Sequence, residues 1–242
     1  MARADESKER RRKPVLSQKL LAEFIGTFFA TLVPTAVDIL YYTGEHVDPV
    51  SRWLARGFIT TALIYAFSEV SGAHVDPAVS LGFAVRRALA PVQMLFYWIV
   101  QFAGGFAAAY LALALWGRQI ALGASHPGSH FTQFEALVTE VVVTFLLMTI
   151  ILATAGEHAV VGKQAALAVG LTVATCGFFA GPISGASMNP GRSIPPQILG
   201  GQYGIVWIYV VGPCVGAVLA ALLALLVFGK PDEGEKKAGE GA

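Results

Sequence analysis

Two short segments of the chain share an unusual series of small residues, a helix-capping residue and a proline. They span residues 71–77 (Ser-Gly-Ala-His-Val-Asp-Pro) and 184–190 (Ser-Gly-Ala-Ser-Met-Asn-Pro). Asp and Asn are preferred N-caps, and Pro is favoured at the first helical position because its missing N–H needs no partner there. Each segment therefore predicts a tight turn followed by a short helix. The residues expected at the two helix starts are Asp76, Pro77 and Ala78 in the first segment and Asn189, Pro190 and Gly191 in the second.

Two such helix starts that face each other would form a pore for neutral polar molecules. The helices that follow, near residues 78–88 and 191–198, are too short to cross a membrane. Irregular backbone at membrane depth is tolerated only where protein buries it or where it lines a water-filled cavity. Each helix N-terminus would place about half a positive charge there, which repels cations and protons. Free carbonyls and the Asn189 amide would offer hydrogen-bond acceptors and a donor.

The elements that surround these segments are expected to be membrane-spanning helices. Of the 242 residues, 55% are apolar and 14% are charged, whereas about 25% of a soluble domain is charged. A spanning helix needs about 20 apolar residues, and lipid offers no partner to free backbone groups. The six spans predicted on this basis lie near Leu20–Tyr42, Trp53–Val70, Val92–Trp116, Phe134–Ala155, Gln164–Gly181 and Tyr203–Phe228.

The second half of the chain repeats features of the first half in the same order. Three features recur at offsets of 117, 113 and 112 residues: Glu23 and Glu140, the two capped segments, and the stretches that begin at Gln101 and Pro213. Because three spans per half is an odd number, the two halves have opposite orientations in the membrane. We therefore predict an all-α membrane protein with six transmembrane helices and two re-entrant half-helices in an inverted 3+3 repeat. Repeat 1 is expected at about residues 18–117 and repeat 2 at about 132–228, within a channel domain of residues 18–228.

The distribution of positive charge predicts the orientation. Lys and Arg accumulate on the cytoplasmic side of membrane proteins, and with the N-terminus inside, thirteen of the seventeen Lys and Arg residues fall on that side. The prediction is a multi-pass protein of the cell membrane with both termini cytoplasmic. Residues 1–17 and 229–242 are expected to be disordered cytoplasmic tails. The basic run in the first tail is interpreted as an orientation signal rather than a nucleic-acid site.

These residues together resemble the aquaporin (major intrinsic protein) family. The stretch from His74 to Ser80 is similar to the first signature of that family, with Asp in place of Asn. The stretch from Asn189 to Ser193 is similar to the second signature, with Gly in place of Ala. The resemblance covers about 210 residues. It implies an hourglass fold in a lipid bilayer and a homotetramer with one pore in each subunit.

The resemblance also implies which residues select solutes. The filter positions fall on Arg192, Ala186, Gly177 and Arg56. Gly177 and Ala186 leave an open lumen, and the water-specific pattern has a His at the position of Gly177. That pattern has a Phe at the position of Arg56. Alternatively, Arg56 points into the external vestibule or pairs with a loop carboxylate such as Glu45 or Asp48.

Three further ionisable residues require an interpretation. A carboxylate inside a span often marks a proton or ion site, but in this family Glu23 and Glu140 resemble struts that accept hydrogen bonds from the re-entrant loops. Asp76 departs from the family pattern, because an ionised carboxylate accepts hydrogen bonds without donating one. The sequence leaves its protonation state open. His74 next to Asp76 has no third ligand at a usable spacing, so no metal site is expected.

The predicted function is a passive channel for water, with glycerol, urea, ammonia and metalloid hydroxides as additional candidate solutes. Two alternatives stay open. Arg56 together with Arg192 suggests an anion-permeable channel of the same fold, and inverted repeats with broken helices are also used by secondary transporters. The sequence contains no recognisable nucleophile–base pair or metal-ligand cluster, so we expect no enzyme activity and no cofactor. No nucleic-acid partner is expected.

Overall fold

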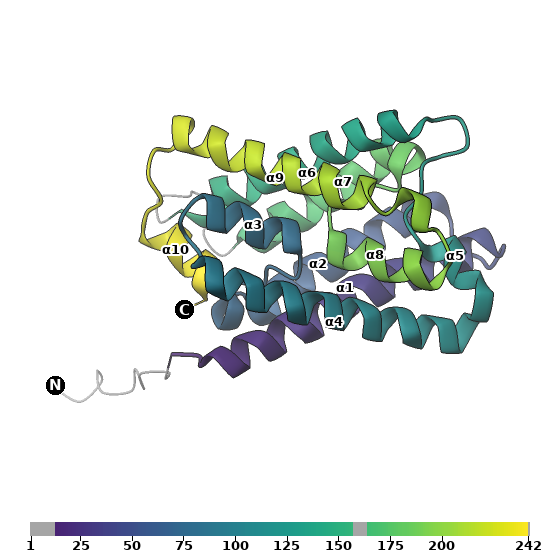
Figure 1. Cartoon of the computed structure of the whole chain (residues 1–242), viewed down its shortest axis with the longest axis horizontal. Coiled ribbons are helices and arrows are strands. Elements are labelled where there is room, and N and C mark those ends of the chain that lie inside the picture. Colours follow the sequence, from purple (N-terminus) through teal and green to yellow (C-terminus); the bar gives the residue numbers. More distant parts are fainter. Residues whose placement is uncertain (1–12, 157–163, 242) are drawn as a thin grey trace, which may run out of the picture.

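The computed structural model describes residues 13–156 and 164–241, and within these ranges six long helices surround two short ones (Figure 1). The long helices are α1 (Leu16–Tyr42), α2 (Pro49–Ser71), α4 (Pro91–Trp116), α6 (Gln133–Ala155), α7 (Ala165–Ser184) and α9 (Ile208–Val227). The two short helices in the middle are α3 (Pro77–Val85) and α8 (Pro190–Leu199). The remaining elements are η1 (Gly117–Gln119), α5 (Ile120–Gly123), η3 (Tyr203–Ile205) and α10 (Glu233–Glu240). The predicted all-helical membrane fold is confirmed.

The long helices differ in how well they suit a membrane. Within the described residues, α1, α6, α7, α4 extended to Gln119 and α9 preceded by η3 are long and apolar enough to span one. Helix α2 is not among these five, although it has 23 residues. It carries Arg52, Arg56 and Glu69 along its length. Polar groups inside a membrane require partners, so the surroundings of α2 are important for the site.

The helices pack as two inverted halves. Helix α1 contacts α4 and α2, and in the same way α6 contacts α9 and α7, while α2 contacts α7 across the two halves. A glycine lies at the α1–α4 crossing and another at the α6–α9 crossing. A Cβ atom on Gly104 would overlap the carbonyl oxygen of Phe24, and a Cβ atom on Gly216 would overlap that of Val141. Because these pairs are related by the repeat, the same close approach of backbones occurs in both halves.

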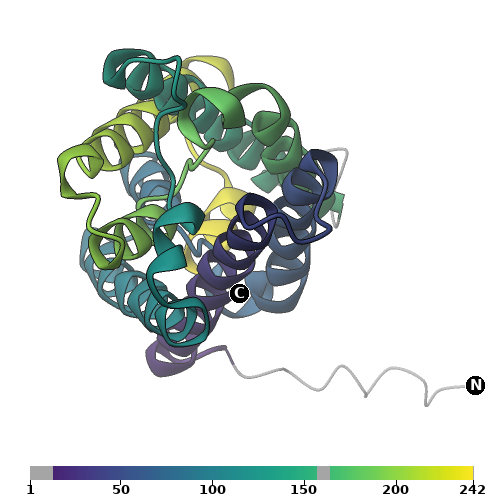
Figure 2. The ribbon, with the colours of Figure 1, turned by 90° about the vertical axis from the view of Figure 1, so that its right-hand side faces the viewer.

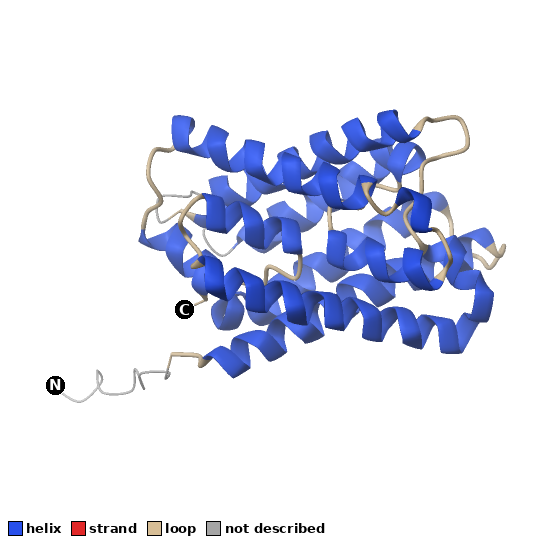
Figure 3. Ribbon diagram, in the orientation of Figure 1, coloured by secondary structure: helices blue, strands red, loops and turns tan. Residues whose placement is uncertain are grey.

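The half-helices α3 and α8 lie end to end in the middle of the bundle, and each is preceded by a loop that reaches the interior (Figures 1 and 3). Both half-helices pack against α4 and α9, the third long helix of each half. Asp76 caps α3 and accepts a hydrogen bond from the backbone N–H of Ala78 at 2.7 Å. Asn189 caps α8 and accepts one from the N–H of Arg192 at 3.1 Å. Each capping residue thus fixes the start of its half-helix in the middle of the bundle.

Glu23, in α1, holds the loop that leads to α3. Its side chain is fully buried. One carboxylate oxygen accepts hydrogen bonds from Ser71 Oγ at 2.6 Å and from the backbone N–H of His74 at 2.9 Å. The other accepts from the N–H of Val75 at 2.7 Å and from Gln101 Nε2 at 2.8 Å. The Glu23 carboxylate therefore accepts hydrogen bonds from four buried donors, which solvent water does not reach.

Glu140, in α6, makes the equivalent contacts in the second half. It is also fully buried. It accepts hydrogen bonds from Ser184 Oγ at 2.7 Å and from the backbone N–H groups of Ser187 and Met188, both at 2.8 Å. A charged acceptor strengthens each of these hydrogen bonds relative to a neutral one.

The two loops need this support because their backbone is strained. Four residues that are not glycine have positive φ angles there: Ala73 (50°), Val75 (46°), Ala186 (43°) and Met188 (58°). Positive φ is a genuine outlier for a β-branched residue such as Val75, and each such residue costs about 1–3 kcal/mol. The glutamates bind the N–H groups of Val75 and Met188 themselves, so they stabilise the strained conformation directly.

The C-terminal segment differs from the expected disordered tail of residues 229–242. Residues Glu233–Glu240 form α10, which packs against α2, α3 and α6. In a view along the long axis of the molecule, α10 lies behind the centre of the ring of helices (Figure 2). The composition of the segment is typical of solvated chain, but Ala238 and Gly239 are small enough to pack closely, and Glu235 pairs with the buried Arg86.

We predict that Glu140→Gln destabilises the protein by about 2–5 kcal/mol, because an amide both weakens the acceptors and brings an N–H₂ group toward backbone donors. The measurement is thermal unfolding in detergent. Glu135→Gln is the matched control, since Glu135 lies in the same helix but at its exposed start. The control is expected to lower the unfolding temperature much less. Equal shifts for the two variants would contradict the assigned role of Glu140.

Candidate functional site

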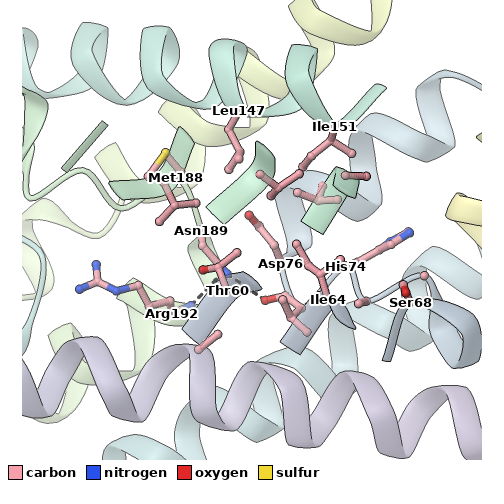
Figure 4. Close-up of a pocket in the computed structure, with 18 of the residues that line it drawn as sticks. Thr60, Ile64, Ser68, His74, Asp76, Leu147, Ile151, Met188, Asn189 and Arg192 are labelled. Atoms are coloured by element: carbon pink, nitrogen blue, oxygen red, sulfur yellow. Dashed lines mark hydrogen bonds between the residues drawn. The ribbon is translucent and has the colours of Figure 1, made fainter. Parts of the chain in front are cut away.

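A cavity of about 180 Å³ lies along the two re-entrant loops, and Figure 4 shows residues that line it. Its walls come from α1, α2, α6 and α7, from the half-helices α3 and α8 with the loops before them, and from α10. In the close-up, Arg192 lies toward one end, Asp76 and Asn189 lie in the middle, and His74 and Ser68 lie toward the other end. The structure therefore brings residues from both halves of the sequence to one path.

The middle of the path is formed by the starts of the two half-helices. Asn189 Nδ2 donates a hydrogen bond to the carbonyl oxygen of Val75 at 2.9 Å, which links the two loops. A Cβ atom on Gly191 would lie 3.1 Å from Cδ of Pro77, so the half-helices are in contact there. Both helix dipoles direct their positive ends to this point. This arrangement disfavours cations in the middle of the cavity.

His74 lines the cavity but is held by its neighbours. Its Nδ1 lies 3.0 Å from Ser80 Oγ. The ring stacks on Phe83 with a centroid distance of 4.7 Å and meets Tyr97 edge-on at 5.3 Å. Among the described residues, no group of three or more His, Cys, Asp or Glu side chains could hold a metal ion. The packing of His74 gives it a structural role in the wall.

Arg56 and Arg192 meet at one end of the cavity, and a buried carboxylate joins them. Arg56 pairs with Asp38 through Nη2 and donates from Nη1 to the carbonyl oxygen of Gly185 at 2.7 Å. Arg192 Nη2 lies 3.4 Å from the same oxygen of Asp38, and its Nη1 bonds to Ser125. Both arginines are buried. The positive charge at this end of the cavity is thus partly balanced by a residue of α1.

Asp38 is the functional candidate that the sequence analysis missed. The loop carboxylates considered there as partners of Arg56 were Glu45 and Asp48, but Asp48 instead caps α2 and accepts hydrogen bonds from the N–H groups of Val50 and Ser51 at 2.8 and 2.9 Å. A carboxylate inside an apolar span needs a positive partner. The position of Asp38 within the first predicted span was therefore a signal that could have identified it.

The two small residues assigned to the filter have different surroundings. Ala186 lines the cavity, in the loop before α8. Gly177 is not among the described residues of the cavity wall. A Cβ atom on Gly177 would lie 2.6 Å from Cε3 of Trp53, so the indole ring occupies the space that a larger side chain would need. Gly177 is therefore packed against the indole ring in the interior, a contact that the sequence did not indicate.

A second cavity of about 50 Å³ lies beyond Arg56. It is lined by Asp38, Tyr42, Arg52 and residues of the segment from Ala124 to Gly128, among others. Within the described residues, Arg56 is the residue that both cavities share. The Arg56 side chain therefore separates the main cavity from a polar vestibule.

Comparison with known proteins supports the assignment suggested by this geometry. The sequence pattern of the family described as "Major intrinsic protein" matches residues 10–224. "Aquaporin NIP2-2" of Zea mays is 37% identical over 210 residues, which cover 86% of this chain and 70% of the relative. "Aquaporin NIP1-4" of Oryza sativa subsp. japonica is 41% identical over 206 residues, which cover 84% and 74%.

The fold is also found among solved structures. The X-ray structure of the aquaglyceroporin from Plasmodium falciparum matches with a TM-score of 0.80 and 22% sequence identity, over 88% of this chain and 97% of that one. Members of the family are membrane channels and not enzymes, which confirms the predicted class at this level. Sequence and fold agree that the chain belongs to the major intrinsic protein family.

Proposed function

We propose that the protein is a passive channel for water and small uncharged solutes. The observation that carries the proposal is the meeting of the two half-helix starts inside a continuous cavity. The carbonyl oxygen of Val75 and the amide of Asn189 lie beside this path. Such an arrangement provides hydrogen bonds to a passing neutral molecule and a positive barrier to cations. Arg192 adds positive charge toward one end.

The surroundings of the two buried glutamates argue against the transporter alternative. A coupling site would need carboxylates that are free to bind an ion or proton during transport. Glu23 accepts four hydrogen bonds and Glu140 accepts three. These contacts support a structural role for both.

The range of solutes depends on the wall near Arg56. Ala186 provides little side-chain volume there, which favours passage of molecules larger than water, such as glycerol and urea. Arg56 lines the same region with a longer side chain. Ammonia and metalloid hydroxides have compatible size and neutrality. We further propose a homotetramer in the cell membrane with cytoplasmic termini, on the basis of the family and of the charge distribution.

We predict that proteoliposomes containing the protein shrink faster than empty liposomes after an osmotic shock, and that they re-swell in glycerol or urea. Stopped-flow light scattering measures both fluxes. Val173→Trp should reduce them because Val173 lines the cavity, and Leu171→Trp should not because Leu171 is exposed on the same helix. The proposed function would be refuted if proteoliposomes that contain folded protein shrank no faster than empty liposomes.

A further prediction concerns the proposed barrier to cations. Asp76→Asn preserves the cap of α3 and, if Asp76 is ionised in the resting pore, removes a negative charge that offsets the helix dipoles. At an effective dielectric constant of about 20, a charge about 8 Å from a cation contributes roughly 2 kcal/mol. The variant should therefore leak protons and potassium about tenfold less than the original protein.

This leak is measured in liposomes with a pH dye and with potassium flux between pH 5 and 8. Asp48→Asn is the matched control, because Asp48 also caps a helix but lies outside the main cavity. It should leave the leak unchanged. Equal leaks in the Asp76 variant and the original protein would show that Asp76 is not ionised in the path, while the proposal of a water channel would stand.

A further inference from the structure

Three arginines surround one carboxylate at the Arg56 end of the main cavity. Asp38 is 3% exposed, and Arg52, Arg56 and Arg192 are between 4% and 7% exposed. Asp38 is the one acidic residue in the described lining of the second cavity, and Asp76 is the one in the lining of the main cavity. The net charge of these four side chains, at the end near Arg56, is therefore positive, and a positive net charge by itself attracts anions.

The two oxygens of Asp38 have different partners. Oδ1 accepts a hydrogen bond from Arg52 Nε at 2.7 Å. Oδ2 pairs with Arg56 and lies 3.4 Å from Arg192 Nη2. Oδ2 thus faces the two arginines that line the main cavity, whereas Oδ1 faces an arginine that lines only the vestibule.

Arg52 is also held away from the main path by aromatic rings. Its guanidinium carbon lies 4.4 Å from the ring centroids of Tyr41 and Trp53 and 4.8 Å from that of Tyr42. Such stacking stabilises a cation without using its hydrogen-bond donors. Arg56 also stacks on Trp53, with its guanidinium carbon 4.4 Å from the ring centroid. The arginines differ in the cavities that they line, and the pair formed by Asp38 with Arg56 is the one placed between the two cavities.

We propose that Asp38 is a specificity-determining residue that makes the channel exclude anions. This proposal rests on the channel function proposed above. Asp38 acts in two ways: it cancels one positive charge between the two cavities, and it orients Arg56 and Arg192 along the wall. Nε of Arg56 and Nε of Arg192 are buried without a protein acceptor in the described residues.

The charge argument predicts a large effect. Removal of one negative charge some 8 Å from a passing anion, at an effective dielectric constant of about 20, changes the rate of passage about tenfold or more. Asp38→Asn should therefore raise chloride and nitrate conductance by about this factor, whereas potassium conductance should stay low. A purely structural role for Asp38 would not shift the preference from cations to anions.

Two double variants distinguish the effect of net charge from the effect of which arginine lacks a partner. Asp38→Asn with Arg56→Gln and Asp38→Asn with Arg52→Gln have the same net charge as the original protein. The first removes the unpaired arginine between the cavities and should again exclude anions. The second leaves Arg56 without its partner and should conduct them. Because these two variants are compared with each other, the test also works if Asp38→Asn alone fails to fold.

The measurements are reversal potentials in planar bilayers under chloride and nitrate gradients, with water flux of the same preparations as the reference. Anion conductance that is equally low in Asp38→Asn and both double variants would overturn the inference, as would equal conductance in the two double variants. If the original protein conducts no water, the proposed function itself fails. If it conducts water and Asp38→Asn excludes anions, only the role of Asp38 is refuted.

A separate observation concerns α10 and the opposite end of the cavity. Arg86, which follows α3, is fully buried and donates from Nε to Glu235 at 3.0 Å and from Nη1 to the carbonyl oxygen of Gly229 at 2.7 Å. Ala238, on the same helix as Glu235, lines the main cavity next to Gly72 and His74. A buried ion pair thus holds a mostly polar helix against the end of the path.

We infer that α10 is a displaceable cap that limits flux through this end of the channel. The contacts of α10 with the bundle include the Arg86–Glu235 pair, the close packing of Ala238 and Gly239, and hydrogen bonds from Lys19 Nζ and Gln93 Nε2 to the carbonyl oxygen of Glu240. The open state of a two-state element is commonly populated at about 10% or less. Release of α10 would therefore raise water permeability about tenfold or more.

Charge reversal tests the cap. Glu235→Arg should release α10 and raise water permeability, and the exchange Arg86→Glu with Glu235→Arg should restore the original value. Glu233→Arg is the matched control, because Glu233 lies on the exposed side of α10. If charge reversal prevents folding, Glu235→Gln provides a milder release. Unchanged permeability in folded Glu235→Arg or Glu235→Gln protein would overturn this inference without affecting that on Asp38.

Discussion

The hydrogen bonds from the re-entrant loops to two buried glutamates are the interactions on which the rest of the structure depends. A loop at membrane depth exposes backbone donors where no water can satisfy them. Glu23 and Glu140 accept these donors and also hold Val75 and Met188 at positive φ. Without this support, neither loop could present its carbonyl groups to the cavity or begin its half-helix in the middle of the bundle.

The inverted repeat makes the framework symmetric, but the residues along the path are not. The glutamates, the serines that they bind and the tyrosines that donate to the carbonyl groups of those serines occur in both halves. In contrast, Asp76 occupies the position equivalent to Asn189, and His74 the position equivalent to Ser187. The duplicated framework supplies stability, and the differences between the halves give the two ends of the path different chemistry.

The sequence predicted the six long helices and the two short ones because the length of the apolar stretches, the helix caps and the internal repeat can all be recognised in the sequence itself. It could not predict which carboxylate would pair with Arg56, since this depends on how α1 and α2 pack. The position of the Trp53 ring beside Gly177 is a choice of side-chain conformation that no pattern encodes. Helix α10 was missed because its polar composition gives no sign of the buried Arg86 that it contacts.

The polarity of α2 has a consequence for how the chain enters the membrane during synthesis. Within the described residues, α2 is a long helix that does not qualify as a span on its own apolar length. Its charged residues Arg52 and Arg56 both bind Asp38, near the end of α1. Arginine within a lone helix opposes its transfer from the translocon into lipid. Helices α1 and α2 would therefore leave the translocon together as a hairpin, already joined by these ion pairs.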